Sequence, residues 1–127
     1  MEAYNYILEY ELRTTAKVIY PYICTASGLE EWFADKVNVV DQNNFNFIWD
    51  DEDHPARLLS TRLNKFAKFE FENSENNGII ELDLEVSELS NSTYLIIKDG
   101  ASNFENEDEA KELWDFLIGK LKEKLVC

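Results

Sequence analysis

The chain has 127 residues, of which 45% are hydrophobic and 13% aromatic, enough apolar material for one domain with its own core. Its 26 acidic and 12 basic residues give a net charge of -14, which would repel nucleic acid and anionic membrane surfaces. No segment approaches the roughly 20 apolar residues of a membrane-spanning helix. We therefore expect a single domain over residues 1–127, with no nucleic-acid partner and no membrane insertion.

The cysteines and the N-terminus indicate a reducing compartment. Cys24 falls within a predicted helix and Cys127 is the last residue, so the pair resembles neither a disulfide framework nor a metal site. Met1 and Glu2 lead into an alternating pattern instead of the basic and apolar segments of a signal peptide. We therefore expect a cytoplasmic protein. Its acidity is typical of a soluble surface, and a protein partner with a basic surface is the alternative.

The first two elements are expected to be a strand and a helix. Residues 4–12 alternate between apolar and polar side chains, which predicts a strand with one buried face. Thr14 or Thr15 can then cap a helix that extends to Ile23, because apolar residues recur there at helical spacing. Pro21 removes a backbone donor from this helix and should bend or shorten it.

A second short helix is predicted by residues 27–30, which read SGLE and have the spacing of a capping box. In that motif the serine oxygen accepts a hydrogen bond from one unpaired backbone amide, and the glutamate reaches back to another. The predicted helix carries three apolar residues, Leu29, Trp32 and Phe33.

Six consecutive strands are expected to follow, because the spacing of apolar residues returns to two. The predicted strands are 37–40, 45–49, 56–63, 66–72, 80–86 and 93–98. The predicted connections are 42–44, a charged break over 50–55, a polar turn over 73–78, and 90–92. In the strand 80–86, Glu81, Asp83 and Glu85 occupy the polar positions, and we expect them to face water.

A long amphipathic helix is the strongest prediction in the chain. Asn106 with Glu109 can cap its start, acids crowd its first turn, and lysines occupy its last turn. At about 20 residues and about 30 Å it can lie across a whole small sheet. Its apolar face recurs at three- and four-residue steps and comprises Ala110, Leu113, Trp114, Leu117, Ile118, Leu121 and Leu125.

This order predicts an α+β fold of the pattern β-α-α-β6-α, in which a curved antiparallel meander surrounds the C-terminal helix. Four segments carry a family resemblance. They are 15–20, 26–34 with the letters LEEWF, 45–50 with the letters FNFIWD, and 112–121 with the letters ELWDFLIGKL. Together they resemble the helix-grip fold of the START-like, birch-pollen-allergen-like superfamily (SRPBCC). The branch they resemble is that of the C-terminal domain of the heat-shock chaperone ATPase activator.

The resemblance implies a cavity between helix and sheet that commonly holds an apolar or amphipathic small molecule, and in some relatives a cyclase or dehydratase site. Plain packing is the alternative, because 17 aromatic residues could fill the space. Polar handles for a ligand are expected at Tyr20, Tyr94 and Trp114. The expected ligand-binding residues are Trp32, Phe33, Phe47, Trp49, Phe69, Phe71, Leu82, Leu84, Tyr94, Trp114 and Leu117.

No catalytic or metal-binding constellation is recognisable in the sequence. His54 is the only histidine, and the acidic run 50–53 beside it lacks the spacing and glycine of a calcium loop, which favours a solvated turn. We expect no catalytic residue, no metal and no cofactor. The leading hypothesis is a non-catalytic module that binds a hydrophobic small molecule such as a lipid or an aromatic metabolite. The alternatives are a protein-interaction module and a small cyclase or hydrolase that uses a buried carboxylate.

Overall fold

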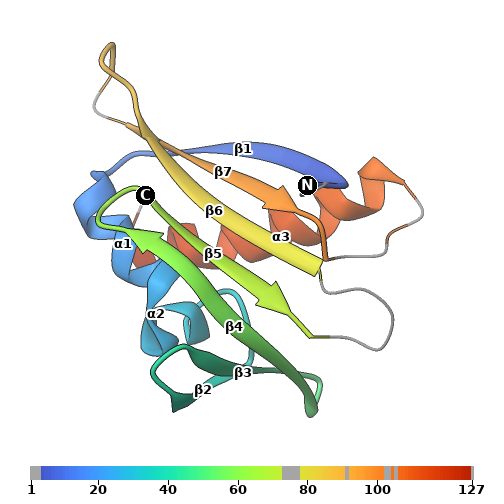
Figure 1. Cartoon of the computed structure of the whole chain (residues 1–127). Coiled ribbons are helices and arrows are strands. Elements are labelled where there is room, and N and C mark those ends of the chain that lie inside the picture. The colour runs from blue at the N-terminus through green and yellow to red at the C-terminus, as the bar shows by residue number, and fades with distance from the viewer. Residues whose placement is uncertain (1–3, 73–77, 91, 102–103, 105, 127) are drawn as a thin grey trace.

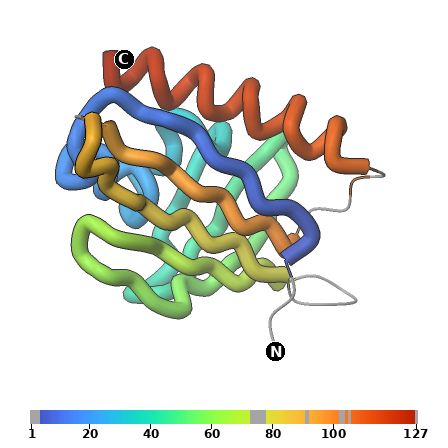
Figure 2. The backbone as a smooth tube through the Cα atoms, turned by 90° about the horizontal axis from the view of Figure 1, so that it is seen from above, coloured from blue at the N-terminus to red at the C-terminus, as the bar shows by residue number. Residues whose placement is uncertain are grey.

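The computed structural model describes residues 4–72, 78–90, 92–101, 104 and 106–126. Its seven strands form one antiparallel sheet in the order β1-β7-β6-β5-β4-β3-β2, and α3 lies across one face of it (Figures 1 and 2). The predicted α+β helix-grip architecture is therefore confirmed. In chain order the elements are β1 (Tyr6–Leu12), α1 (Ala16–Cys24), α2 (Ala26–Glu30), β2 (Lys36–Asp41), β3 (Asn44–Trp49), β4 (Glu52–Arg62), β5 (Phe66–Phe71), β6 (Gly78–Val86), β7 (Thr93–Asp99) and α3 (Glu107–Leu125).

The two short helices carry the chain from one edge of the sheet to the other. β1 pairs with β7, from Tyr6 opposite Asp99 to Leu12 opposite Thr93, whereas β2 forms the far edge. The hairpins β2 to β7 then cross the sheet back toward β1 as a meander. The first and last strands of the chain therefore lie side by side, and the inward-facing side chains of all seven strands meet the helices on one face.

Thr25 joins the two short helices without a linker. Thr15 caps α1 as predicted, and Pro21 lies inside the helix without ending it. Thr25 then ends α1, and its Oγ1 accepts a hydrogen bond from the Gly28 N–H at 3.0 Å, which starts α2. The predicted capping box at 27–30 is therefore wrong, because Thr25 already supplies the cap two residues earlier. Trp32 and Phe33 lie beyond the end of α2.

The predicted charged break over 50–55 is also too long. Only Asp50 and Asp51 form the turn between β3 and β4, both with positive φ, as in the two-residue turns that suit hairpins. β4 begins at Glu52, and Pro55 sits within the strand opposite Asn46. The strand was predicted to begin at residue 56, and its first four residues were missed because a run of acids and a proline is uncommon in strands.

The C-terminal helix begins and is buried as its pattern predicts. The side chain of Asn106 accepts a hydrogen bond from the Glu109 N–H at 3.0 Å, with acids in the first turn and Lys122 and Lys124 in the last. The residues of α3 that are buried against the sheet are Ala110, Trp114, Leu117, Ile118 and Leu121. Leu113, in contrast, is 40% exposed.

Two of the three carboxylates that were expected to face water on β6 are largely covered. The side chains of Glu81 and Asp83 are 17% and 18% exposed, and Lys98 Nζ lies 3.7 Å and 2.9 Å from their oxygens. Burial and a hydrogen bond with Glu81 raise the pKa of Asp83 from 3.8 to about 6. Burial tends to raise the pKa of Glu81, but hydrogen bonds with Asp83 and Tyr4 together with the charges of Lys98 and Lys68 outweigh it, so this pKa is lowered. Glu85 is exposed as expected.

This carboxyl pair should make stability depend on pH. Between pH 3.8 and about 6 the folded protein binds the Asp83 proton more tightly than the unfolded chain, so stability falls as the pH rises through this window. We expect the free energy of unfolding of the wild type to fall by about 1 kcal/mol between pH 5 and pH 8. The Asp83→Asn variant should not show this decrease. Urea unfolding of both proteins at the two pH values measures this difference. Glu85→Gln on the same strand is the control, and an Asp83→Asn effect of equal size at both pH values would refute the assignment.

Candidate functional site

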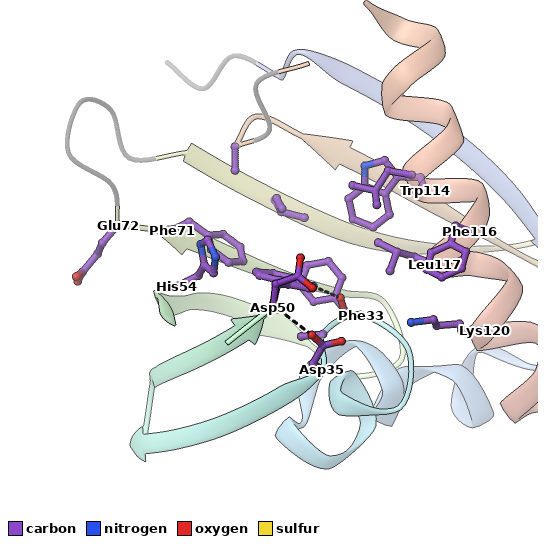
Figure 3. Close-up of a pocket in the computed structure, with 15 residues that line it drawn as sticks. Phe33, Asp35, Asp50, His54, Phe71, Glu72, Trp114, Phe116, Leu117 and Lys120 are labelled. Carbon is purple, nitrogen blue, oxygen red and sulfur yellow. Dashed lines mark hydrogen bonds between the residues drawn. The ribbon is translucent and has the colours of Figure 1, made fainter. Parts of the chain in front are cut away.

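A cavity of about 580 Å³ lies between α3 and one end of the sheet (Figure 3). At this end β3, β5 and β7 stop and β4 and β6 begin, so hairpin termini and the segment after α2 all reach the space. Residues 113–120 of α3 close it from the other side. The lining residues are Phe33, Ala34, Asp35, Trp49, Asp50, His54, Phe71, Glu72, Ile80, Ala101, Leu113, Trp114, Phe116, Leu117 and Lys120.

Phe33 is the central ring of the cavity wall. It stacks on Trp114 of α3 with ring centroids 5.8 Å apart, and its edge meets Trp49 of β3 at 5.2 Å. Trp49 in turn contacts the ring of His54 at 5.1 Å and that of Phe71 at 6.2 Å. Because each ring is held by others from different elements, the apolar wall is fixed before any ligand enters.

The indole N–H groups of all three tryptophans are already paired within the protein. Trp49 Nε1 donates to the Phe33 carbonyl at 2.7 Å, and Trp32 Nε1 donates to the Tyr22 carbonyl at 2.8 Å. Trp114 Nε1 donates to Asp99 Oδ2 at 3.0 Å, and the Asp99 side chain is buried. The expected polar handle at Trp114 is therefore engaged with Asp99.

Two tyrosines were also expected as polar handles, and neither lines the cavity. Tyr20 makes side-chain hydrogen bonds with Thr61 and Cys24, and burial raises its pKa. Tyr94 stands opposite Glu11 and Glu85 in the sheet, on the face that points away from α3. Polar contacts to a ligand must therefore come from other residues at the mouth of the cavity.

The residues that were expected to bind the ligand lie at different depths in the protein and on different faces of the sheet. Phe33, Trp49, Phe71, Trp114 and Leu117 come together in the cavity wall. Leu84 lines a shallow groove beside Ala16 and Leu63 instead, and Tyr94 lies on the outer face. The others are buried in the core beneath the cavity and have no exposed surface or almost none, namely Trp32, Phe47, Phe69 and Leu82.

The polar residues of the cavity mouth were not recognised as site residues from the sequence. Asp35 Oδ2 accepts a hydrogen bond from the Asp50 N–H at 2.9 Å, which fixes the β3–β4 turn over the cavity. Lys120 extends from α3 toward these two acids, and its Nζ lies 4.7 Å from the centre of the Phe116 ring (Figure 3). The arrangement can hold an apolar body against the rings and a polar group at the mouth.

Neither a metal centre nor a membrane-spanning helix is found among the residues that the structure describes. Within residues 4–72, 78–90, 92–101, 104 and 106–126, no group of three or more histidine, cysteine, aspartate or glutamate side chains could hold a metal ion. In the same ranges no helix has the length and apolar character needed to cross a membrane.

Comparison with known structures agrees with the architecture. BfR322 from Bacteroides fragilis shares 33% sequence identity at a TM-score of 0.64, over 98% of this chain and 93% of that one. The Aha1 dimer from Colwellia psychrerythraea gives a TM-score of 0.74 at 15% identity, with 92% of both chains covered. MLL2253 from Mesorhizobium loti gives 0.76 at 15% identity, with 94% and 95% covered. At such low identities the last two similarities show the fold alone.

The family assignment comes from the sequence itself. Among curated proteins, none matches the chain in sequence. A family model described as a START-like superfamily domain, however, matches residues 1–126. The chain therefore belongs to the START-like superfamily.

Proposed function

We propose that this domain binds an apolar or amphipathic small molecule, such as a lipid or an aromatic metabolite, between the sheet and α3. The observation that carries the proposal is the cavity of about 580 Å³ walled by Phe33, Trp49, Phe71 and Trp114. Its volume is typical of small-molecule sites, and its apolar wall with a polar mouth is the usual arrangement of such sites. Membership in the START-like superfamily supports a ligand-binding or interaction module.

The alternative that aromatic residues fill the space applies to only part of the interior. Phe47 and Phe69 lie edge to face at 5.5 Å and are completely or almost completely buried, so this region is close-packed. Space remains where α3 passes over the end of the sheet, between Phe71 and Ile80 on one side and Leu117 on the other. A ligand that enters there would cover apolar surface that is otherwise in contact with water.

A bulky residue at the mouth should block binding. Leu113 lines the cavity and is 40% exposed, so Leu113→Trp can fill the mouth with little cost to the core. We expect saturable binding of fatty alcohols or neutral aromatic probes to the wild type, and at least about tenfold weaker binding to this variant. Isothermal titration calorimetry measures both affinities.

The matched control is Leu89→Trp, at a residue that is fully exposed and does not line the cavity. This variant should bind as the wild type does. If neither fatty alcohols nor neutral aromatic probes show saturable binding to the wild type, the proposed function is wrong.

A further inference from the structure

We propose that the cavity selects ligands whose polar end is a cation, such as an amine attached to an apolar or aromatic body, over the same ligands with an anionic end. This inference rests on the proposed function and specifies its ligand class. Two independent features of the cavity support it, namely the charge of its mouth and the aromatic rings beside that charge.

The charge at the mouth is predominantly negative. Three of the lining residues are acids, Asp35, Asp50 and Glu72, whereas Lys120 is the single lysine or arginine among the lining residues that the structure describes. The net charge of -14 on the chain adds a field of the same sign. An anionic group would therefore enter against repulsion, and a cation would enter with attraction.

At the mouth, the Asp35 carboxylate and the backbone of Asp50 are held in place before a ligand arrives. The hydrogen bond from the Asp50 N–H to Asp35 Oδ2 ties the two residues together, and Asp50 occupies a two-residue turn with φ of 51°. Figure 3 shows Asp50 between His54 and the side chains of α3. A positively charged group bound there would meet the fixed carboxylate of Asp35, which reduces the entropy that binding costs.

Aromatic rings lie next to these carboxylates. Trp49 and Phe71 both line the cavity, and the hydrogen bond from Trp49 Nε1 to the Phe33 carbonyl fixes the orientation of the indole. The faces of such rings attract organic cations, most strongly for tryptophan. Carboxylates beside aromatic rings therefore favour an ammonium group more strongly than either feature would alone.

The ammonium group of Lys120 would compete with a cationic ligand for the carboxylates at the mouth. Its side chain points from α3 toward Asp35 and Asp50, while its Nζ lies over the Phe116 ring at the outer edge of the cavity (Figure 3). A cationic ligand must bind despite this charge, so removal of Lys120 should strengthen the binding of a cation. If Lys120 instead held an anionic end, its removal would weaken the binding of an anion.

The experiment compares three probes that share a naphthalene body, namely 1-naphthylmethylamine, 1-naphthalenemethanol and 1-naphthoate. Calorimetric titrations at pH 7.5 and low salt should show the amine binding about tenfold more tightly than the carboxylate, with the alcohol between them. Asp50→Asn should reduce this ratio about threefold, because asparagine tolerates the positive φ but lacks the charge. Lys120→Gln should increase the ratio.

Glu9→Gln is the matched control, because Glu9 is exposed on the outer face of the sheet opposite Ile96 and its replacement removes the same unit of charge. This variant should keep the wild-type ratio. The inference is overturned if the alcohol binds but the carboxylate binds as tightly as the amine, or if Glu9→Gln changes the ratio as much as Asp50→Asn. If none of the three probes binds, the inference is overturned, whereas the proposed function is wrong only if fatty alcohols also show no saturable binding.

Discussion

Gly28→Ala should destabilise the protein by about 3 kcal/mol, although alanine is the better helix former. Gly28 lies inside α2, where Thr25 brings this helix directly against the end of α1. A Cβ atom at residue 28 would lie 2.7 Å from Tyr22 Cα and would overlap the carbonyl of Pro21. Both are backbone atoms, so the strain cannot be relieved by a side-chain rotation. Urea unfolding monitored by circular dichroism measures the loss.

Gly119→Ala is the matched control, because it makes the same chemical change within a helix. Apart from its chain neighbours and the backbone of its own helix, a Cβ atom at residue 119 of α3 would have no atom within 4 Å. We therefore expect this variant to be more stable than the wild type by about 0.5–1 kcal/mol. A Gly28→Ala variant of wild-type stability would show that α1 and α2 can separate without cost, contrary to the close approach seen here.

The elements that sequence analysis predicted correctly are those whose signals are local and repeated. The spacing of Ala110, Trp114, Leu117 and Leu121 defined α3 because every buried residue of a helix recurs on one face. Alternation likewise defined β1 and β6. The capping residue of α2 was missed because SGLE and the preceding threonine both offer a cap, and only the arrangement of α1 and α2 determines which one is used.

The candidate site was harder to predict than the fold. Alternation tells which face of the sheet a side chain occupies, but it does not tell at which end of the sheet α3 leaves a space. Phe47 and Trp49 therefore looked equivalent, although Phe47 is completely buried and Trp49 lines the cavity. Asp50 was predicted to belong to a solvated turn, and it is an exposed turn residue that also lines the cavity. The signal that could have found it is its place at a hairpin end that also carries Trp49.

Asp99 was not predicted as a core residue, because the predicted last strand ended at residue 98, one residue before the end of β7. It continues the inward-facing positions of β7 after Leu95 and Ile97, so alternation would place a carboxylate in the core. The structure shows the reason for this position. Asp99 Oδ2 accepts from Trp114 Nε1 at 3.0 Å, and its Oδ1 accepts from the Ala101 N–H at 2.9 Å. The carboxylate thereby ties the last strand to the helix that covers the sheet.

Asp99→Ala should accordingly cost about 3 kcal/mol of stability, because it leaves the buried Trp114 N–H without this acceptor and removes a charge-assisted bond to the Ala101 amide. It should also weaken the binding of a neutral aromatic probe, since Trp114 stacks on Phe33 in the cavity wall. Urea unfolding and calorimetric titration measure the two effects.

A double-mutant cycle with Trp114→Phe separates this hydrogen bond from the other contacts of Asp99. Phenylalanine keeps an aromatic ring against Phe33 but has no N–H to donate, so Asp99→Ala should cost about 1–2 kcal/mol less in the Trp114→Phe background than in the wild type. Strictly additive effects of the two substitutions would mean that the bond contributes nothing to holding α3 on the sheet. In that case the position of Trp114 in the cavity wall would depend on its packing in the core, including the stack on Phe33.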